Sequence, residues 1–449
     1  MTILDTFKSI WTSPSTVNSP SSGLYHYARE NENEKSRIHL RVDPDGTGTL
    51  IINANRIMHL NPTAALMAYL ILEKVKEQQA IDTIQEKYRV SKSEARADYS
   101  SFILHLSSLF SDACPIHELD LETVMPFSAR PSAPYRMDLA VTYRCNNDCA
   151  HCYNARERDF PELTAEQWFK VMDDLWALGV PHIIFTGGEA TLRDDLPELI
   201  AHAESNGQIT GLNTNARRLS DQRYVQTLVD AGLDHVQITV ESCDEQIHDE
   251  MMRAKGAFKQ TVQGLKNALN SKLFVMTNTT MLRTNVHTIP DTLDFLAEIG
   301  VPTVGLNALI YAGNGLTVGT GLHERELQPI LDMALQKISA SGQRLIWYTP
   351  TQYCNFDPTQ SDLGVKGCTA SLYSMCIESN GNVLPCQSYY HPLGNILTDA
   401  WDSIWNHELS VQLRERKGLP TKCEGCPVVS ECGGGCPLQF QIEGLQVAS

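Results

Sequence analysis

Apolar residues in the middle of the chain alternate between two spacings. Six strand-like runs are each followed by a stretch with the three-to-four-residue spacing of a helix. The runs are MDLAVTY, HIIFTGG, ITGLNTN, HVQITVE, FVMTNTTML and TVGLNALIY. The helical stretches are Thr164–Leu178, Leu196–Ser205, Ser220–Ala231, Phe258–Leu269, Ile289–Ile299 and Glu324–Ser339. Thr164 with Gln167 forms a capping box, and Gly207 is suited to end a helix.

Six successive β/α units predict an α/β fold in which parallel strands are covered by helices. A closed barrel has eight such units, so we expect a partial (β/α)6 TIM-like barrel over residues 135–345. By analogy with closed barrels, the chemistry should lie at the carboxyl ends of the strands.

The regions on either side of this barrel have different patterns. Residues 35–112 contain three strand-like runs (RIHLRV, TLIINAN and RIMHL) and then three helices, with caps at Asn61 and Ser91. They predict a winged-helix-like α+β domain. Residues 1–34, which include a Ser- and Pro-rich stretch, should be flexible, and residues 113–134 should form a linker.

Residues 346–449 lose the periodicity and are rich in Cys, Gly and Pro. We expect one hairpin there (CIESNGNVLPC) and a short helix near Trp401–Trp405. A region with so little regular structure needs additional stabilisation, which metal bound by its cysteines can provide.

Composition excludes several classes of protein. The chain has 36 basic and 53 acidic residues, a net charge of −17, which argues against a nucleic-acid partner. Its mean hydropathy is −0.23, and no apolar run is long enough to cross a bilayer. The N-terminus does not resemble a signal peptide. We therefore expect a cytoplasmic protein without membrane contact.

Cysteine placement is the strongest chemical signal. Thirteen cysteines are present, and without an export signal a disulfide framework explains them poorly. Only Cys114 and Cys243 stand alone. The others form three groups, which suggests metal binding. The groups are Cys145, Cys149 and Cys152; Cys354, Cys368, Cys376 and Cys386; and Cys423, Cys426, Cys432 and Cys436.

The first group, Cys145-x3-Cys149-x2-Cys152, follows the first barrel strand. Three thiolates on one tight loop can hold three irons of a [4Fe–4S] cluster and leave the fourth open to chelate a ligand. The alternative is a structural zinc site, which needs a fourth ligand such as the neighbouring His151.

The next strand ends in Gly187-Gly188-Glu189. The two glycines allow close approach of the backbone to a ligand, and Glu189 can accept a hydrogen bond from an ammonium group. By itself this motif could be a plain turn.

Together, these two motifs resemble the radical S-adenosylmethionine (SAM) superfamily over about residues 135–310. The resemblance implies that Cys145, Cys149 and Cys152 hold the cluster and that its open iron binds SAM. It also implies cleavage of SAM to a 5′-deoxyadenosyl radical, with Gly187, Gly188 and Glu189 as the motif for the SAM amine.

Other polar residues at strand ends are further candidates for SAM contacts. Thr239 and Glu241 end the fourth strand, and Asn213 lies on the third. Arg253 could bind the SAM carboxylate or be an ordinary surface arginine. His151 stands where an aromatic is usual in the family, and its ring could stack on adenine. Asn278 and Asn307 could equally be satisfied interior amides.

Gly381-x4-Cys386 followed by Cys423-x2-Cys426-x5-Cys432-x3-Cys436 resembles the SPASM domain, which carries auxiliary iron–sulfur clusters. The resemblance places two ligand sets, which are Cys354, Cys368, Cys386 and Cys436 for the first cluster, and Cys423, Cys426 and Cys432 for the second. No cysteine follows Cys436, so the fourth position of the second cluster could be Glu431, an open iron or the spare Cys376. The cluster could also be incomplete, and zinc is the alternative for all these thiols.

The N-terminal domain resembles PqqD-like domains, which bind a leader peptide along the edge of a small sheet. A winged-helix DNA reader and a purely structural cap are the alternatives. Residues 25–122 contain 11 basic and 15 acidic residues, a net of −4, without a basic stripe. Peptide binding is therefore the better interpretation.

These resemblances imply a radical SAM peptide maturase that oxidatively crosslinks a ribosomally made precursor peptide bound through its leader. Its cofactors would be SAM, the [4Fe–4S] cluster and one or two auxiliary clusters, and its reductant a low-potential flavodoxin or ferredoxin. Three alternatives stay open. They are an enzyme of haem or tetrapyrrole biosynthesis, a peptide epimerase with Cys243 or Cys376 as the hydrogen donor, and a non-enzymatic iron–sulfur scaffold.

Overall fold

A computed structural model describes residues 19–30, 35–53, 56–109, 130–156, 158–361 and 363–439. The chain divides into two compact units. The first is Met1–Ser132 with Ala177–Pro181, and the second is Ala133–Trp176 with His182–Ser449. Cys114 and most of the expected linker lie outside the described residues.

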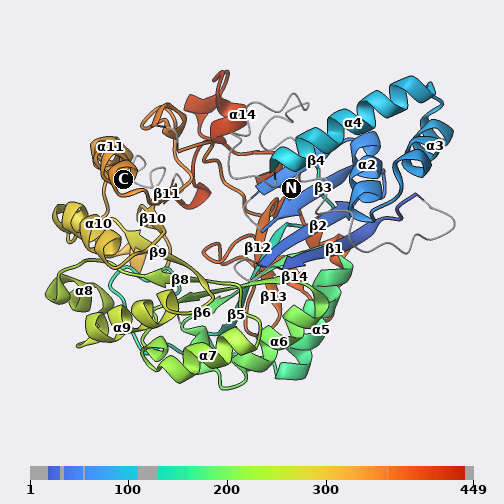
Figure 1. Cartoon of the computed structure of the whole chain (residues 1–449). Coiled ribbons are helices and arrows are strands. Elements are labelled where there is room, and N and C mark those ends of the chain that lie inside the picture. Colours follow the sequence, from blue (N-terminus) through green and yellow to red (C-terminus); the bar gives the residue numbers. More distant parts are fainter. Residues whose placement is uncertain are drawn as a thin grey trace. The chain divides into compact units, whose positions relative to one another are not determined.

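The first unit contains an antiparallel sheet in the order β1-β2-β3-β4, followed by three helices (Figure 1). The bounds are β1 Gly23–Glu30, β2 Lys35–Val42, β3 Gly48–Ile52, β4 Arg56–Leu60, α2 Pro62–Leu72, α3 Glu77–Tyr88 and α4 Lys92–Leu109. The three expected strands and three expected helices are all present. Asn61 caps α2 by accepting from the backbone N–H of Ala64 at 2.8 Å, as its position in the sequence predicts.

Strand β1 was not expected, because it lies in the segment that we predicted to be flexible. That prediction is wrong for residues 23–30, which pair with β2 from Gly23 opposite Val42 to Glu30 opposite Lys35. The aromatic side chains of Tyr25 and Tyr27 pack against the core of the domain. These two rings supply the apolar contact that holds a fourth strand on the sheet.

The second unit contains the expected run of parallel strands. Six strands lie side by side in chain order, with helices along the outside (Figure 1). The strands are β5 Arg136–Thr142, β6 His182–Gly187, β7 Ile209–Thr214, β8 His235–Thr239, β9 Phe274–Thr280 and β10 Thr303–Asn307. The helices are α5 Ala165–Ala177, α6 Leu196–Asn206, α7 Gln222–Asp230, α8 Glu245–Met252, α9 Ala257–Leu269, α10 Ile289–Glu298 and α11 Glu324–Ser341. Because the end strands of this sheet do not pair with each other, the barrel is partial, as expected.

The sheet continues beyond the six expected strands on both sides. β11 (Arg344–Trp347) pairs parallel to β10, so it crosses the boundary that we expected at residue 345. On the other side β12 (Ser374–Ile377) pairs parallel to β5 and forms the expected hairpin with β13 (Asn382–Leu384). β14 (Gly394–Asn395) follows. The Cys-rich region therefore shares a sheet with the barrel.

The rest of the Cys-rich region is mostly loop. The short helix expected near Trp401–Trp405 is α12, with those bounds. α13 (Glu408–Arg414) and α14 (Val429–Cys432) were not expected. None of the helices within the described ranges is long and apolar enough to span a membrane.

Candidate active site

The cysteine loop, which is residues 143–156 and 158, follows the carboxyl end of β5. The end of α8 holds its backbone in place. The carbonyl oxygen of Met251 accepts from the N–H of Ala150 at 2.9 Å, and that of Met252 accepts from the N–H of Asp148 at 3.2 Å. These two hydrogen bonds therefore fix the loop, which follows β5, to the helix that follows β8.

Asn314 holds the same loop from the turn after β10. Its backbone N–H donates to the carbonyl of Cys152 at 2.9 Å, and its Nδ2 donates to the carbonyl of Cys149 at 3.0 Å. A Cβ on the neighbouring Gly313 would lie 2.6 Å from the carbonyl oxygen of Cys152, so only glycine fits there. Sequence reasoning missed Asn314, although the flanking glycines after a strand end were a usable signal.

The three thiols of this loop interact electrostatically. Burial raises the pKa of Cys145 to about 11, that of Cys149 well above its usual value and that of Cys152 above it. The negative charge of a Cys152 thiolate further raises the pKa of the other two thiols. The free thiols therefore keep their protons at neutral pH, and iron binding must displace them.

This donor set fits a cluster better than a single zinc ion. Within the described ranges, no three His, Cys, Asp or Glu side chains are placed to hold one metal ion together. Each thiolate of a [4Fe–4S] site binds a different iron, so such ligands stand farther apart than those of one zinc. The expected fourth zinc ligand, His151, contacts Glu241 instead.

The glycines of the Gly187-Gly188-Glu189 motif bring two strand ends together. The N–H of Gly188 donates to the carbonyl of Thr142 at 2.8 Å, and the N–H of Glu189 donates to that of Arg144 at 2.9 Å. A Cβ on Gly187 would overlap the carbonyl oxygen of Thr142. We expected these glycines to let the backbone approach a ligand. In this structure they let the end of β6 lie against Thr142 and the first residues of the cysteine loop.

The carboxylate of Glu189 is 1% exposed and accepts hydrogen bonds from Thr191, Thr214 and Asn215. Its Oε1 accepts from the N–H and hydroxyl of Thr191 and from the hydroxyl of Thr214, at 3.2, 2.7 and 2.7 Å. Its Oε2 accepts from the N–H of Asn215 at 2.8 Å. Glu189 thus joins the ends of β6 and β7, whereas we expected it to accept from an ammonium group.

Glu241 is buried in a similar way. Its Oε2 accepts from the N–H of Thr280 at 2.8 Å, and its Oε1 lies 3.0 Å from His151 Nε2. His151 belongs to the cysteine loop, so this contact ties the loop to the ends of β8 and β9. We expected Glu241 to contact SAM and the His151 ring to stack on adenine.

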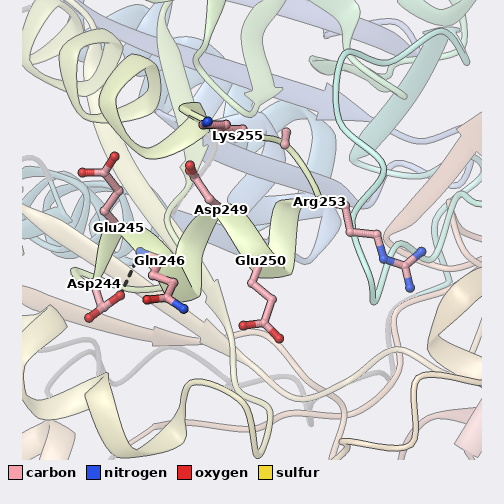
Figure 2. A pocket seen from close by; sticks show the side chains of 8 residues that line it. Asp244, Glu245, Gln246, Asp249, Glu250, Arg253 and Lys255 are labelled. Carbon is pink, nitrogen blue, oxygen red and sulfur yellow. Dashed lines mark hydrogen bonds between the residues drawn. The ribbon is translucent and has the colours of Figure 1, made fainter.

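Arg253 ends α8 in the left-handed conformation, with φ of 48°. Figure 2 shows its guanidinium pointing away from the acidic side chains of α8, Asp249 and Glu250. Its Nη1 lies 3.6 Å from the carboxylate of Asp148 in the cysteine loop. Arg253 also lines a hollow of about 440 Å³ beside the loop, together with Ala150 and Asn314. It is therefore next to the site but half-exposed.

Polar side chains from four successive strands lie at the carboxyl end of the barrel. Asn213 and Thr239 are half-buried near the ends of β7 and β8, and Asn278 and Asn307 occupy similar positions on β9 and β10. Asn278 Oδ1, Asn307 Oδ1 and His151 Nδ1 are buried and have no hydrogen-bond partner among the described residues. Unpaired buried polar atoms are costly, so a polar ligand such as SAM fits here.

Three of the four C-terminal cysteines that we predicted for the first auxiliary cluster, Cys368, Cys386 and Cys436, interact electrostatically. Burial raises the pKa values of Cys368 and Cys386. The charges of Cys436 and Cys386 raise the pKa of Cys368 further, and the charge of Cys436 also raises that of Cys386. We predicted Cys354 as the fourth member of this set. That membership stays a prediction. The residue before Cys354 is Tyr353, whose N–H donates to the Sγ of Cys432 at 3.3 Å.

A hydrogen bond links the cysteine loop to the C-terminal hairpin. The hydroxyl of Tyr153 donates to Gln387 Oε1 at 3.0 Å. Tyr153 directly follows Cys152, and Gln387 directly follows Cys386. The bond therefore joins the neighbours of two expected cluster ligands, which were far apart in the sequence.

A buried carboxylate strengthens the same junction. Glu378, which is 1% exposed, accepts from Arg156 Nη2 at 2.7 Å and from the hydroxyl of Tyr143 at 3.0 Å. The guanidinium of Arg158 lies 3.6 Å from Glu378 and stacks 3.3 Å from the Tyr143 ring centre. One carboxylate thus compensates two cations from the cysteine loop.

Replacing Glu378 with glutamine is expected to lower the free energy of unfolding by about 3 kcal/mol, because it leaves the buried Arg158 and the partly exposed Arg156 without their counter-charge. Urea denaturation measures this effect. The matched control is Asp294→Asn, which removes a carboxylate that holds Lys337 at 2.7 Å on the surface. It should cost less than about 1 kcal/mol. Equal effects of the two variants would contradict the assigned role of Glu378.

Three family models match separate parts of the chain. The Radical SAM superfamily model matches residues 139–296, the iron–sulfur cluster-binding SPASM domain matches residues 368–427, and the Coenzyme PQQ synthesis protein D (PqqD) model matches residues 40–109. Together they account for each region in which the sequence showed a distinct pattern.

Individual relatives extend these matches. Sporulation killing factor maturation protein SkfB of Bacillus subtilis is 26% identical over 426 residues, which is 94% of this chain and 99% of that protein. Fe-coproporphyrin III synthase of Methanosarcina barkeri is 29% identical over 324 residues, covering 66% and 81%. The crystal structure of Streptococcus suis SuiB bound to precursor peptide SuiA has a similar fold. Its TM-score is 0.67 at 17% identity, and the match covers 93% of this chain and 97% of that chain.

Proposed function

We propose that this chain, which belongs to the radical SAM enzymes with SPASM and PqqD domains, oxidatively crosslinks a ribosomally made precursor peptide. The observation that carries the proposal is the arrangement of domains. A peptide-binding type of domain precedes a barrel whose strand ends bear three coupled thiols, and a Cys-rich region continues the barrel sheet. This arrangement suits an enzyme that holds a peptide while it generates a radical.

The residues of the cysteine loop would hold the cluster, and Asn314 and the end of α8 would keep the loop in position. When bound, the cluster and SAM supply a 5′-deoxyadenosyl radical that removes a hydrogen atom from the peptide. The unpartnered polar atoms of Asn278 and Asn307 would orient SAM at the strand ends. The surrounding barrel would exclude water from the reacting atoms.

One or two auxiliary clusters would take up the electron that the peptide radical loses when the new bond forms, and a proton leaves with it. A low-potential flavodoxin or ferredoxin would supply the electron that cleaves SAM. We place the protein in the cytoplasm, where protein thiols are kept reduced.

The leader of the peptide would bind to an open edge of the N-terminal sheet. The outer strands of this sheet are β1 and β4. β4 carries Ile57, a large apolar side chain that is 45% exposed. An extended peptide that pairs with β4 would cover this side chain and satisfy the outer backbone groups of the strand.

A tetrapyrrole substrate is the second candidate, because Fe-coproporphyrin III synthase is among the similar proteins. That match covers 66% of this chain, whereas the match to the sporulation killing factor maturation protein covers 94%. An enzyme for tetrapyrroles has no need of a leader-binding domain. The wider match and the PqqD domain together favour a peptide.

The test is intact-mass analysis of a precursor peptide with its leader, taken from any short reading frame that lies beside the gene, after anaerobic incubation with reconstituted enzyme, SAM and reductant. We expect loss of two hydrogen atoms per crosslink, with 5′-deoxyadenosine formed alongside. An Ile57→Asp variant should bind the leader at least about tenfold more weakly, while SAM cleavage without peptide stays unchanged. A mass that is unchanged in H2O but increases in D2O, because deuterium from the solvent replaces a hydrogen atom of the peptide, would indicate an epimerase. An untouched peptide despite SAM cleavage would contradict the proposal.

A further inference from the structure

The turn that carries Cys354 is fixed against the C-terminal cysteines. The side chain of Glu324, at the start of α11, accepts from the N–H of Gln352 at 3.1 Å and from Asn355 Nδ2 at 2.9 Å. The N–H groups of Asn355 and Phe356 both donate to the carbonyl of Gln352, at 2.8 and 3.1 Å. These bonds determine where the backbone presents Cys354.

The opposite side of this turn contacts the Cys432 region. The N–H of Tyr353 donates to Cys432 Sγ at 3.3 Å, and that sulfur lies 3.5 Å from the carbonyl oxygen of Thr351. A Cβ on Gly435 would lie 2.8 Å from the side chain of Gln352, so the two segments are in direct contact. Cys354 is the next residue after this contact and is exposed.

Electrostatic coupling extends the contact to two more thiols. Burial raises the pKa of Cys423, and the charges of Cys432, Cys354 and Cys426 raise it further. Burial likewise raises the pKa of Cys432, with contributions from Cys354 and Cys426. Geometry supports this coupling. The N–H of Cys426 donates to the carbonyl of Cys423 at 3.2 Å, and a Cβ on Gly434, two residues after Cys432, would lie 3.8 Å from Cys423 Sγ. The contact of Tyr353 with Cys432 Sγ brings the turn of Cys354 to the same place.

The remaining thiols form a separate group. Burial raises the pKa of Cys368, and the charges of Cys436 and Cys386 raise it further. Burial raises the pKa of Cys386 to about 12, with the Cys436 charge contributing. The three-thiol group is therefore Cys368, Cys386 and Cys436.

We propose that Cys354 completes the second auxiliary cluster together with Cys423, Cys426 and Cys432, a set that we call the four-thiol group. This inference rests on the proposed function, because it assigns the ligands of clusters that the SPASM domain implies. The second cluster then needs neither Glu431 nor a cysteine beyond Cys436. The iron without a cysteine ligand would then belong to the three-thiol group, whose Cys386 directly precedes Gln387, the residue that accepts from Tyr153.

The test is a thiol footprint of the iron-loaded chain. Each protein is reconstituted with iron and sulfide under anaerobic conditions, treated with iodoacetamide and mapped by mass spectrometry. In the unsubstituted protein we expect Cys354 to react at least about tenfold more slowly after loading than before, because a bound thiolate is not free to attack. Cys243, which belongs to neither group, should react equally in both states.

Two single substitutions then assign Cys354 to one group. With Cys432→Ser, Cys354 should lose its protection, and with Cys368→Ser it should keep it. Cys426 is the internal standard in the Cys368→Ser protein, where its continued protection shows that the four-thiol group is intact. Circular dichroism at both substitutions checks that the chain remains folded.

Two results overturn the assignment. One is a Cys354 that stays reactive in the loaded, unsubstituted protein. The other is a Cys354 whose protection is lost in Cys368→Ser while Cys426 stays protected. The footprint requires no turnover, so it remains decisive even if the peptide proves untouched. A failure of the proposed function would appear instead as iron-loaded protein that leaves the peptide unchanged.

Discussion

Replacing Cys149 with alanine is expected to abolish the formation of 5′-deoxyadenosine and to leave the auxiliary iron in place. Cys149 lies in the centre of the cysteine loop, and its thiol donates to Met252 Sδ at 3.3 Å. Without it, two thiols remain for a cluster that needs three. We expect SAM cleavage to fall by at least about a thousandfold, because the reaction depends on that cluster. Chromatography of the nucleoside product and iron analysis measure the two effects.

Cys243→Ala is the matched control. Cys243 lies in the same barrel and is half-buried, and its N–H donates to Thr292 at 3.0 Å, a bond that the substitution keeps. This variant should load iron and cleave SAM like the unsubstituted protein. Cleavage of SAM by Cys149→Ala at the normal rate would contradict the role of the loop. A Cys243→Ala variant that still cleaves SAM but no longer converts the peptide would point to Cys243 as a thiol hydrogen donor.

Local signals in the sequence were sufficient for most of the fold. Thr164 and Gln167 exchange the two hydrogen bonds of a capping box at the start of α5, at 3.4 and 3.0 Å. Gly207 ends α6 with φ of 88°, a conformation that glycine adopts at low cost. Such motifs act over four or five residues, so they can be identified without knowledge of the tertiary structure.

Features that depend on distant pairing could not be predicted. β1 is a strand because β2 offers it an edge, and β12 joins the barrel because β5 lies beside it. Neither pairing leaves a mark in the local pattern of apolar residues. The position of Cys354 is a further example, since Glu324, which fixes its turn, precedes it by an entire helix and strand.

The residues that we expected to contact SAM show what a sequence motif can predict. It predicts which part of the fold a residue occupies better than it predicts what the side chain binds. Glu189 and Glu241 lie at strand ends beside the cysteine loop, as their motifs suggested, yet their carboxylates bind other parts of the protein. Among the described residues, the buried side-chain atoms without a hydrogen-bond partner include the amide oxygens of Asn278 and Asn307 and also Glu241 Oε1. A polar side chain is available to a ligand only where the protein does not already supply its hydrogen-bond partners. Those partners are determined by the folded structure and not by the local sequence.

Replacing Gly187 with alanine is expected to disrupt the site without removing any ligand. Gly187 has φ of 131°, and an added Cβ would overlap the carbonyl oxygen of Thr142 at the start of the cysteine loop. No flexible side chain can give way, so the ends of β5 and β6 must separate. We expect a loss of about 3 kcal/mol or more in stability, from backbone strain and overpacking together. The amount of iron bound by Cys145, Cys149 and Cys152 should also decrease. Iron analysis of the reconstituted protein measures this decrease.

Gly300→Ala separates the two causes of this effect. Gly300 also has a positive φ, of 86°, but an added Cβ would have no atom within 4 Å. It therefore carries the backbone strain without the collision. If Gly187→Ala lowers cluster iron and Gly300→Ala does not, the collision with Thr142 is the cause, and the glycine is needed to bring β6 against the loop. If both variants keep their iron equally well, the close approach of the two strand ends is not what holds the cysteine loop in place.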